Sequence, residues 1–448
     1  MGALLGIAAR NLVQARRRTL LLGVAIAGVT ALLVLLLSLS GGLNDTILRT
    51  ATTLDTGHVN VGGFFKVRTG VASPMVTGTA AVRKIAEQTL PDLVHVVERQ
   101  RGWASVVGPT GATMAGALMG IDYANEPALG GMLKLAEERE YRDGGAPEVK
   151  GDLARLAEPG TIALFVDQAK KLEAMVGDTV TLSAPNFRGT SNTADVTVVA
   201  VLRNVGVMSS WYLFTPASTV RGLYSLKEDN AGALLLYLKD IERAPEAMAA
   251  LRAAYLEQGY RLMEHQGDPY YMKFETVAGE DWTGQKLDLT TWDDEVSFLR
   301  WILQAFDSIS VFLAAILMGI IGVGIVNAMW MAVRERTREI GTLRAIGMSR
   351  RRVLAMFLLE GVLLGLDATL AGGLLGAAIG LGLDALAIEL RSEAARMILM
   401  SDTLHLRVSA GQVVGAVAIL TGLTTLATFG PAYRASRMRP ITAIHHIG

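Results

Sequence analysis

Four long apolar runs constrain this sequence more than any other feature. The first, Leu20 to Leu37, contains no charged residue and, with its flanks, is long enough to cross a hydrocarbon core of about 30 Å. The other three runs cover residues 309–333, 353–383 and 413–429, whereas residues 38–308 are mixed and polar. The pattern predicts one membrane span, a large water-exposed domain and then three further spans.

The composition agrees with a membrane protein that has a large water-exposed part. Of the 448 residues, 51% are hydrophobic, and the mean hydropathy is +0.37. These values are too apolar for an ordinary soluble protein and too polar for a wholly embedded one. The chain has no cysteine, which excludes a disulfide framework, a thiolate metal site and a cysteine nucleophile.

Basic residues are concentrated in three segments, although the formal net charge of the whole chain is zero. Residues 1–18 carry four basic and no acidic residues, residues 334–352 carry seven and two, and the tail after Phe429 carries three and none. With four spans, all three segments fall on one side of the membrane. The positive-inside rule makes that side cytoplasmic, so we expect both termini in the cytoplasm.

The spans and the basic segments together predict the order of the parts. Residues 1–18 suit an amphipathic helix on the cytoplasmic membrane surface. The first span, 19–41, is expected to be an uncleaved signal anchor because Ser38-Leu39-Ser40 is a poor cleavage site. The other expected segments are a large outer domain over 42–300, spans over 304–333, 353–383 and 411–431, a cytoplasmic loop over 334–352, an outer loop over 384–410 and a cytoplasmic tail over 432–448.

Strand-like and helix-like segments alternate within the large domain, which predicts an α+β domain with its own core. Strands are expected at 58–65, 94–99, 104–107, 112–121, 160–166, 179–183, 195–202, 211–214, 233–239 and 261–264, and helices at 168–175, 216–226 and 245–258. Glycine-rich joins at Gly130-Gly131 and Gly144-Gly145 predict two subdomains with a break near 125–155. Residues 283–303 are expected to form a helical stalk that leads into the second span.

The cytoplasmic loop contains a short helical pattern from Arg336 to Ile346. Its apolar residues, Ile340, Leu343 and Ile346, recur near helical spacing. Gly347 is placed to end this helix, and Ser349 is placed to cap the next one. From composition alone, the segment is either an ordinary positive-inside loop or a helix that carries force from a soluble partner into the membrane.

The third span carries both small and charged residues. Gly372, Gly376 and Gly380 share one helix face, where small residues let two helices approach closely, either between chains or within one chain. Glu360 lies near the inner interface, whereas Asp367 lies deeper, where a charge costs about 2.5–3.5 kcal/mol. Asp367 either lines a polar cavity or is accommodated by snorkelling, protonation or pairing.

The sequence offers no motif for catalysis. It contains no P-loop, and Leu39-Ser40-Gly41-Gly42 imitates part of an ATPase signature by chance. No catalytic triad is indicated, and His445-His446 lacks nearby metal ligands, so neither a catalytic residue nor a metal site is expected. The arginines flank membrane spans, which indicates lipid headgroups as partners and argues against nucleic acid.

Three motifs resemble the FtsX-like permease family of ABC transporters. They are Glu339-Ile-Gly-Thr-Leu-Arg-Ala-Ile-Gly347 with Arg350-Arg-Arg-Val353 and Glu360-Gly361, the tail Pro431-Ala-Tyr-Arg-Ala-Ser-Arg-Met-Arg-Pro440, and the start Arg10-Asn-Leu12 with Arg16 to Leu20. The arrangement of one span, a large domain and three spans is also similar to that family.

Within that family, the outer domain resembles that of lipoprotein-releasing permeases, through residues 160–182, 195–202 and 211–223. The connection over 184–193 is shorter than the hook by which one permease of such systems recruits its periplasmic carrier. A reduced partner-binding loop would comprise Pro185, Asn186, Phe187 and Arg188.

The resemblance implies a type VII permease that is not itself an enzyme and has no cofactor of its own. A cytoplasmic ABC ATPase dimer, which binds ATP and magnesium, would dock on the loop helix and drive the periplasmic α+β domain. The expected coupling residues are Arg336, Arg338, Glu339, Ile340, Gly341, Leu343, Arg344, Ala345 and Gly347. A second permease, identical or paralogous, would complete the transporter in the bacterial inner membrane.

The implied function is the release of lipoprotein or another lipid-anchored cargo from the inner membrane, with a periplasmic carrier as a further partner. Two alternatives remain, namely mechanotransmission to a cell-wall hydrolase and export of peptides or drugs. The macrolide-exporter branch usually fuses its ATPase in front of the first span. Only residues 1–18 precede the span here, so we expect the ATPase to be a separate chain.

Overall fold

The computed structural model describes residues 2–68, 70–186, 189–297, 300–390, 392, 395–396, 399 and 401–438. The chain divides into two compact units. One, the helical unit, comprises Met1–Asp45, Ile302–Glu389 and Thr403–Gly448. The other, the sheet unit, comprises Thr46–Trp301 and Leu390–Asp402.

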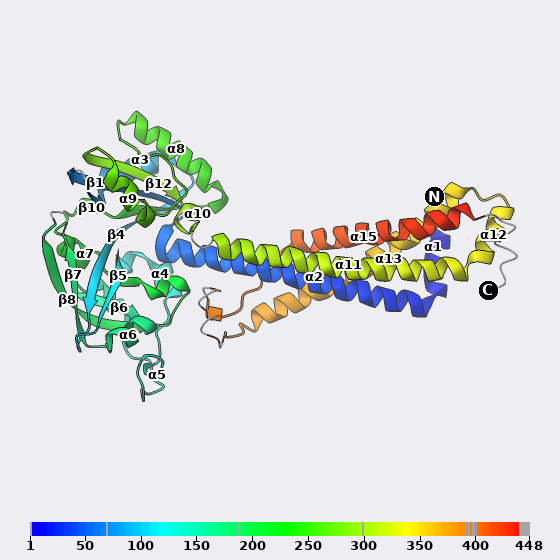
Figure 1. Ribbon diagram of the computed structural model, residues 1–448, viewed down its shortest axis with the longest axis horizontal. Coiled ribbons are helices and arrows are strands. Elements are labelled where there is room, and N and C mark those ends of the chain that lie inside the picture. Colours follow the sequence, from blue (N-terminus) through cyan, green and yellow to red (C-terminus); the bar gives the residue numbers. More distant parts are fainter. Residues whose placement is uncertain are drawn as a thin grey trace. The chain divides into compact units, whose positions relative to one another are not determined.

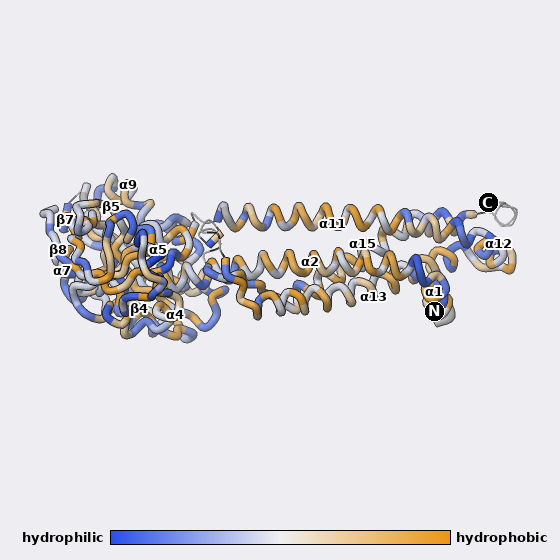
Figure 2. Tube along the Cα trace, turned by 90° about the horizontal axis from the view of Figure 1, so that it is seen from below, coloured by the Kyte–Doolittle hydropathy of each residue, from blue (hydrophilic) through white to orange (hydrophobic). Residues whose placement is uncertain are grey.

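The helical unit is built from long apolar helices that lie side by side (Figure 1) and are hydrophobic along most of their length (Figure 2). They are α2 (Arg16–Ala51), α11 (Arg300–Glu335), α13 (Arg350–Ala385) and α15 (Ala410–Arg437). Within the described residues, these four are long and apolar enough to cross a membrane, which confirms the predicted number of spans. Two shorter helices, α1 (Gly2–Gln14) and α12 (Thr337–Ala345), complete the unit.

The helices continue further than hydropathy predicts. Hydropathy ends the first span at 41, yet α2 continues to Ala51. Similarly, α15 continues through Pro431 to Arg437, although the last span is predicted to end at 431. Backbone hydrogen bonding continues into polar sequence, because helix formation does not require apolar side chains. One shared core joins the four helices through residues such as Ile26, Ile325, Phe357 and Leu420.

The sheet unit contains a ten-stranded mixed sheet in the order β12-β1-β11-β4-β5-β9-β6-β8-β7, with β2 paired to β1. The pairs β5–β9 and β6–β8 are parallel. The strands are β1 (Val59–Arg68), β2 (Val71–Pro74), β4 (Leu93–Val107), β5 (Thr113–Ile121), β6 (Thr161–Phe165), β7 (Thr179–Pro185), β8 (Ser191–Leu202), β9 (Tyr212–Pro216), β11 (Ala233–Leu238) and β12 (Gly284–Thr291), and a separate small sheet pairs β3 (Val76–Thr77) with β10 (Asn230–Ala231).

Helices cover this sheet in two lobes, each with its own core. The first lobe packs α3 (Thr79–Thr89) and α8 (Ala244–Glu257) on β1, β11 and β12. The second packs α6 (Val166–Leu172) and α7 (Ala217–Tyr224) on β5 to β9. Short helices fill the connections, namely α4 (Pro127–Met132), α5 (Glu138–Tyr141), α9 (Phe274–Gly279), α10 (Trp292–Glu295), the π-helix η1 (Thr52–Thr56) and the 3-10 turns η2 (Tyr123–Asn125), η3 (Leu153–Ala157), η4 (Val207–Ser210), η5 (Ile241–Arg243) and η6 (Tyr270–Lys273).

The predicted subdomain break near 125–155 is wrong. Ala136 and Tyr141 belong to the core of the second lobe, so that segment lies inside one subdomain. The chain instead passes between the lobes within β4, where two expected strands form one strand of 15 residues. Glycine-rich joins indicate turns, and turns inside a lobe have the same composition as turns between lobes.

The predicted helical stalk over 283–303 is also wrong in its first part. Residues 284–291 form β12, which pairs antiparallel with β1 along its full length. In this segment Leu287 and Leu289 alternate with Lys286 and Asp288, a period of two that favours a strand. The strand expected at 261–264 is reduced to one bridge, between Leu262 and Leu287.

Candidate functional site

The short helix α12 presents one packed face and one open face. Thr337, Ile340 and Gly341 are buried, and Ile340 joins the core of the helical unit. The opposite face is exposed and carries Arg338, Glu339, Thr342, Ala345, Ile346 and Gly347. A helix with a packed inner face and a charged outer face can transmit force from a soluble partner to the membrane helices as a rigid element.

Ion pairs hold the start of α12 to its neighbours. Arg336 Nη1 lies 3.4 Å from Glu360 Oε2 on α13, and its Nη2 donates to the backbone carbonyl of Asn11 at 3.1 Å. Arg18 lies 3.0 Å from Glu335 and 3.9 Å from Glu360. The Glu360 side chain is only 2% exposed, so the two arginines offset the cost of burying its charge. Glu360 therefore joins α1, α2, α12 and α13.

The other end of α12 is held by Arg344. Its Nη1 donates to the carbonyl oxygens of Ser436 at 2.9 Å and Met438 at 2.7 Å. These oxygens lie at the end of α15, where helical carbonyls lack partners and favour a cation. Gly347 ends α12 with a φ of +105°, which L residues rarely adopt, and Ser349 precedes α13 without a side-chain cap.

The predicted coupling residues therefore fall into two groups. Arg338, Glu339, Ala345 and Gly347 lie on the exposed face, whereas Arg336, Ile340, Gly341 and Arg344 hold the helix in place. Leu343 is half-buried. The predicted helix extends from Arg336 to Ile346, whereas α12 runs from Thr337 to Ala345, and the Ile346 side chain beyond its end is 85% exposed.

The three glycines of α13 serve packing within this chain. A Cβ on Gly372 would lie 2.2 Å from the carbonyl oxygen of Ala27, and one on Gly376 would lie 2.8 Å from that of Ala31. A Cβ on Gly380 would lie 2.8 Å from Val408. Gly372 and Gly376 therefore let α13 lie directly against α2, as small residues do in membrane bundles.

Asp367 lies on the outside of the helical unit. Its side chain is exposed and lines a groove of 610 Å³ between α1, α2 and α13. Arg16 and Thr19 line the same groove, and the rest of the lining is mostly apolar. The deep acidic residue therefore faces neither the core of the bundle nor the pair of arginines at Glu360.

A second polar site, which the sequence did not reveal, lies in the sheet unit at the π-helix η1. Arg99 on β4 donates to the carbonyl of Thr53 at 2.8 Å and to that of Leu54. Tyr237 on β11 donates to the carbonyl of Thr52 at 2.9 Å. We call these contacts the η1 clamp. They satisfy the carbonyls at a helix end with side chains from two strands of the sheet.

Buried charges surround the η1 clamp. Arg99 and Glu126 pair at 2.5 Å, with side chains 1% and 4% exposed. Tyr212 in the second lobe donates to Asp55 of η1 at 2.7 Å. Both lobes therefore hold the same five-residue turn. Its sequence, Thr52-Thr-Leu-Asp-Thr56, gave no signal, since the partners that satisfy its polar groups are distant in sequence.

Glu295 on α10 is the most perturbed acid of this region. Burial raises its pKa to about 7, and the nearby Arg101 guanidinium opposes that rise. Its two oxygens accept from the Thr290 hydroxyl at 2.7 Å and the Tyr270 backbone at 3.4 Å. The carboxyl group is therefore largely protonated in mildly acidic solution.

The candidate partner-binding loop joins β7 to β8. β7 ends at Pro185, and the Asn186 N–H donates to the Thr190 carbonyl at 2.8 Å, just before β8 begins at Ser191. Phe187 and Arg188, which were expected to take part in partner binding, lie outside the described residues, as do Arg439, Pro440 and the pair His445-His446.

Comparison with known families finds two matches that together cover most of the chain. Residues 19–254 match the family described as MacB-like periplasmic core domain, and residues 311–440 match the FtsX-like permease C-terminal family. The first match alone covers more than half of the 448 residues. The motifs around α12 lie within the second match.

Two of the similar proteins are named as exporters. The macrolide export ATP-binding/permease protein MacB of Nitrobacter winogradskyi is 39% identical over 217 residues, which are 48% of this chain and 28% of that protein. The pyoverdine export ATP-binding/permease protein PvdT of Pseudomonas fluorescens is 38% identical over 132 residues, 30% of this chain and 18% of that protein. The matches thus span less than a third of these relatives' length.

A solved structure, the periplasmic region of MacB from Actinobacillus actinomycetemcomitans, aligns with a TM-score of 0.29 and 13% identity. It covers 56% of this chain and 98% of that chain, but a score this low carries no argument about fold. The sequence similarities reported above are to MacB-type proteins. This corrects the expectation that the lipoprotein-releasing permeases are the nearest branch.

Proposed function

We propose a function on the premise that this chain belongs to the permease family that combines a MacB-like periplasmic core domain with an FtsX-like C-terminal region. In this proposal the chain is the permease part of an ABC exporter in the bacterial inner membrane. Both termini lie in the cytoplasm, and the sheet unit lies in the periplasm. The three basic segments support that orientation.

The open face of α12 carries the proposal. Glu339 and Arg338 offer opposite charges there, and Ile346 offers an apolar side chain that is 85% exposed. An exposed isoleucine flanked by charges is typical of an interface centre with a polar rim. The occupant that we propose is a cytoplasmic ABC ATPase dimer, since the 448 residues contain no P-loop of their own.

In this mechanism, ATP with magnesium binds only to the ATPase, and this chain performs no bond-making step. Movement of the ATPase displaces α12, and the Arg336–Glu360 pair passes the displacement to α13. Arg344 passes it to the end of α15. A second permease, identical or paralogous, completes a two-fold transporter with eight spans, and the surrounding lipids contact the apolar outer faces.

We propose an exported small amphipathic molecule as the cargo. The names of the relatives, macrolide export and pyoverdine export, support this class. The short connection between β7 and β8 supports it as well, because it is shorter than the hook by which lipoprotein-releasing systems recruit their carrier. Lipoprotein release with a periplasmic carrier is the second candidate, on the resemblance of residues 160–182, 195–202 and 211–223. Control of a cell-wall hydrolase is the third.

The test is capture of the ATPase by tagged full-length permease from its own membranes, with ABC ATPases identified by mass spectrometry. We expect Glu339→Lys to reduce capture strongly while the permease still inserts, and Gly341→Pro to do the same by breaking α12. Glu257→Lys is the matched control, because it reverses an exposed charge on α8 of the sheet unit. If both α12 variants captured the ATPase as well as the wild type does, α12 would not be the coupling helix.

The cargo classes separate in a depletion experiment. Depletion of an exporter should sensitise cells to amphipathic compounds and leave lipoproteins correctly distributed. Accumulation of lipoproteins in the inner membrane would replace the exporter proposal with the lipoprotein one. Co-purification of a cell-wall hydrolase, with neither phenotype, would favour the third candidate.

A further inference from the structure

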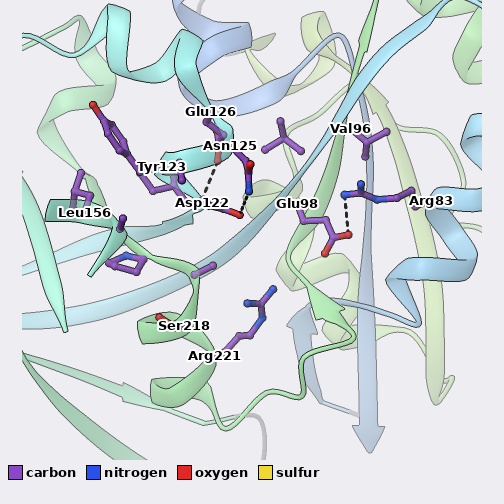
Figure 3. Close-up of a pocket in the computed structure, with 16 residues that line it drawn as sticks. Arg83, Val96, Glu98, Asp122, Tyr123, Asn125, Glu126, Leu156, Ser218 and Arg221 are labelled. Atoms are coloured by element: carbon purple, nitrogen blue, oxygen red, sulfur yellow. Dashed lines mark hydrogen bonds and ion pairs between the residues drawn. The ribbon is translucent and has the colours of Figure 1, made fainter. Parts of the chain in front are cut away.

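Two of the cavities in the sheet unit lie along β4 and differ in charge. The larger, of 680 Å³, is shown in Figure 3. Its charged lining residues are Arg83, Glu98, Asp122, Glu126 and Arg221, so acids outnumber bases there. The smaller measures 390 Å³, within the range of small-molecule sites, and its described lining contains one basic residue and no acid. Only the charge of the smaller cavity favours an anion. Both cavities are separate from α12, so binding there is independent of the proposed coupling role.

Five aromatic residues line the smaller cavity, which we call the aromatic cavity. They are Trp103 on β4, Tyr224 at the end of α7, Tyr270 and Tyr271 on η6, and Phe274 at the start of α9. Trp103 is 57% exposed and Tyr271 is 37% exposed. The Tyr270 ring packs edge-on against the rings of Tyr271 and Phe274, with centroids 5.7 and 6.4 Å apart. The two exposed rings therefore present apolar surface that a ligand with a flat ring would remove from water.

Arg101 on β4 is the charged residue of this lining, and it is only 4% exposed. Its Nη2 donates to Asn60 Oδ1 at 3.1 Å, and its Cζ lies 4.2 Å from the centre of the Tyr270 ring. Its Nε is buried without an acceptor, and within the described residues its Nη1 makes no hydrogen bond either. A buried donor costs free energy unless it is paired, so this guanidinium favours a further acceptor in the cavity.

Two buried acids near Arg101 do not pair with it. Asp55 accepts from the Tyr212 hydroxyl at 2.7 Å, and Glu295 accepts from the Thr290 hydroxyl at 2.7 Å. Burial lowers the pKa of Arg101, and both acids raise it, but within the described residues neither lies within ion-pair distance of the guanidinium. Burial also raises the pKa of Glu295 to about 7, so near neutral pH this acid supplies only part of its charge. An anion in the cavity would supply the charge that Arg101 lacks.

The strand β4 fixes the distance between this charge and the exposed indole. Arg101 and Trp103 are two residues apart, so their side chains leave the same face of the strand about 6.5 Å from each other. The Tyr224 hydroxyl accepts from the Trp103 N–H at 2.7 Å and donates to the Trp103 carbonyl at 2.8 Å, which holds this part of β4 in place. A ligand that contacts both side chains therefore carries its anionic group close to its ring.

We propose that the aromatic cavity binds an aryl carboxylate, a small aromatic acid. The ring packs against Trp103 and Tyr271, and a carboxylate oxygen accepts from the unpaired N–H groups of Arg101. The single arginine matches the single negative charge of a carboxylate, and it repels aromatic cations.

Calorimetric titration of the full-length chain in lipid nanodiscs tests the proposal, with empty nanodiscs as the blank. The probe is 2-naphthoate. Its neutral amide, 2-naphthamide, keeps the ring and lacks the charge, whereas octanoate keeps the charge and lacks the ring. We expect 2-naphthoate to bind about tenfold more tightly than the amide, which loses a charge-assisted hydrogen bond, and at least about threefold more tightly than octanoate, which loses the aromatic contact.

Variants of the two β4 residues separate the charge from the ring. Arg101→Gln should lower the affinity for 2-naphthoate to that for the amide and leave the affinity for the amide unchanged. A merely structural role of Arg101 would weaken both ligands alike. Trp103→Ala should weaken both ring-bearing ligands about fivefold or more, and Trp103→Phe should recover part of this loss. Because Trp103 is 57% exposed, folding should tolerate both of its substitutions.

Two variants outside the aromatic cavity are matched controls. Arg221→Gln removes an arginine from the larger cavity, and Trp301→Ala removes a tryptophan of α11 that is 68% exposed. Both should bind 2-naphthoate as the wild type does.

Four results would each overturn the proposal. They are no detectable binding of 2-naphthoate, equal affinity for the acid and the amide, octanoate binding as tight as that of 2-naphthoate, and undiminished binding of 2-naphthoate by folded Arg101→Gln or Trp103→Ala. Melting curves show which variants are folded. The ligand series and Trp103→Ala keep the proposal testable if Arg101→Gln does not fold.

Discussion

The two polar regions of this protein use the same side chains in opposite ways. At α12, the Arg336–Glu360 pair is itself largely buried, with side chains 13% and 2% exposed, but the outer face of the helix is open and charged. At the η1 clamp, Arg99 and Glu126 are 1% and 4% exposed, and the turn that they hold is buried. One region is therefore suited to meet a partner, whereas the other is suited to hold a fixed geometry.

The difference has an energetic basis. A buried pair costs desolvation that its partner offsets, so removing one member leaves an uncompensated charge and is strongly destabilising. An exposed charge is screened by water and contributes little to folding, so it remains available for binding. Mutations in the two regions should therefore separate into losses of stability and losses of partner binding.

The largest expected effect is at the η1 clamp. Arg99→Ala leaves Glu126 buried without a cation and two η1 carbonyls without donors, so the sheet unit should lose about 3–5 kcal/mol of unfolding free energy. Tryptophan-monitored denaturation of the full-length chain measures this. Arg83→Ala is the matched control, since it removes an ion pair that is partly exposed and should cost no more than about 1 kcal/mol. Equal losses of unfolding free energy in Arg99→Ala and Arg83→Ala would show that the buried pair is no more important for stability than the partly exposed one.

The next effect is a pH dependence from Glu295. Its pKa is about 7 in the folded chain and lies near 4.5 without burial. Its contribution to stability is complete below about pH 4.5 and is lost as the pH rises through 7. Glu295→Gln removes this loss, so between pH 5 and 8 the wild type should lose about 2–3 kcal/mol more than the variant. Parallel stability profiles would show that Glu295 does not titrate there.

A smaller effect is expected where α12 meets α15. Arg344→Ala removes two charge-assisted hydrogen bonds to the carbonyls of Ser436 and Met438, worth about 1.5 kcal/mol together at this partly exposed position. Hydrogen exchange should show faster local opening of residues 433–438 and unchanged exchange in the sheet unit. Arg344→Lys should restore part of the protection, and uniform acceleration throughout the chain would contradict a local role.

The smallest effect on stability is expected on the open face of α12. Ile346→Ser should change the unfolding free energy by less than about 0.5 kcal/mol, because the side chain is 85% exposed and leaves no cavity. The same change should reduce ATPase capture, since the exposed isoleucine is the apolar centre of the proposed contact. If Ile346→Ser lowered the melting temperature but still captured the ATPase, α12 would contribute to stability and not to partner binding, which is the opposite of what we expect.

Much of the fold follows from local patterns. Hydropathy predicts the four spans, and Gly347 marks the end of α12 because its φ of +105° requires a glycine. Strand-like composition predicts β6, β7 and β8, although β6 is a short run buried throughout. The division of the sheet unit was not predictable in this way, because one strand, β4, belongs to both lobes.

The candidate site was predictable in part. The basic residues and the motif locate α12, but only the folded chain shows that Ile340 faces inward and Ile346 outward. Arg99 and Arg221 look alike in the sequence, yet one is paired with Glu126 and the other has no anion within the described residues. No local pattern distinguishes them, because the distinction lies in which distant residues approach each guanidinium.

The sequence by itself determined the number of spans, the place of the water-exposed domain and the absence of cysteine chemistry. These properties depend on the transfer of side chains between water and lipid, which each segment undergoes on its own. The tertiary structure alone decided which charges are paired. Asn11 meets Arg336, and Leu54 meets Arg99, because packing brings distant segments within hydrogen-bond reach.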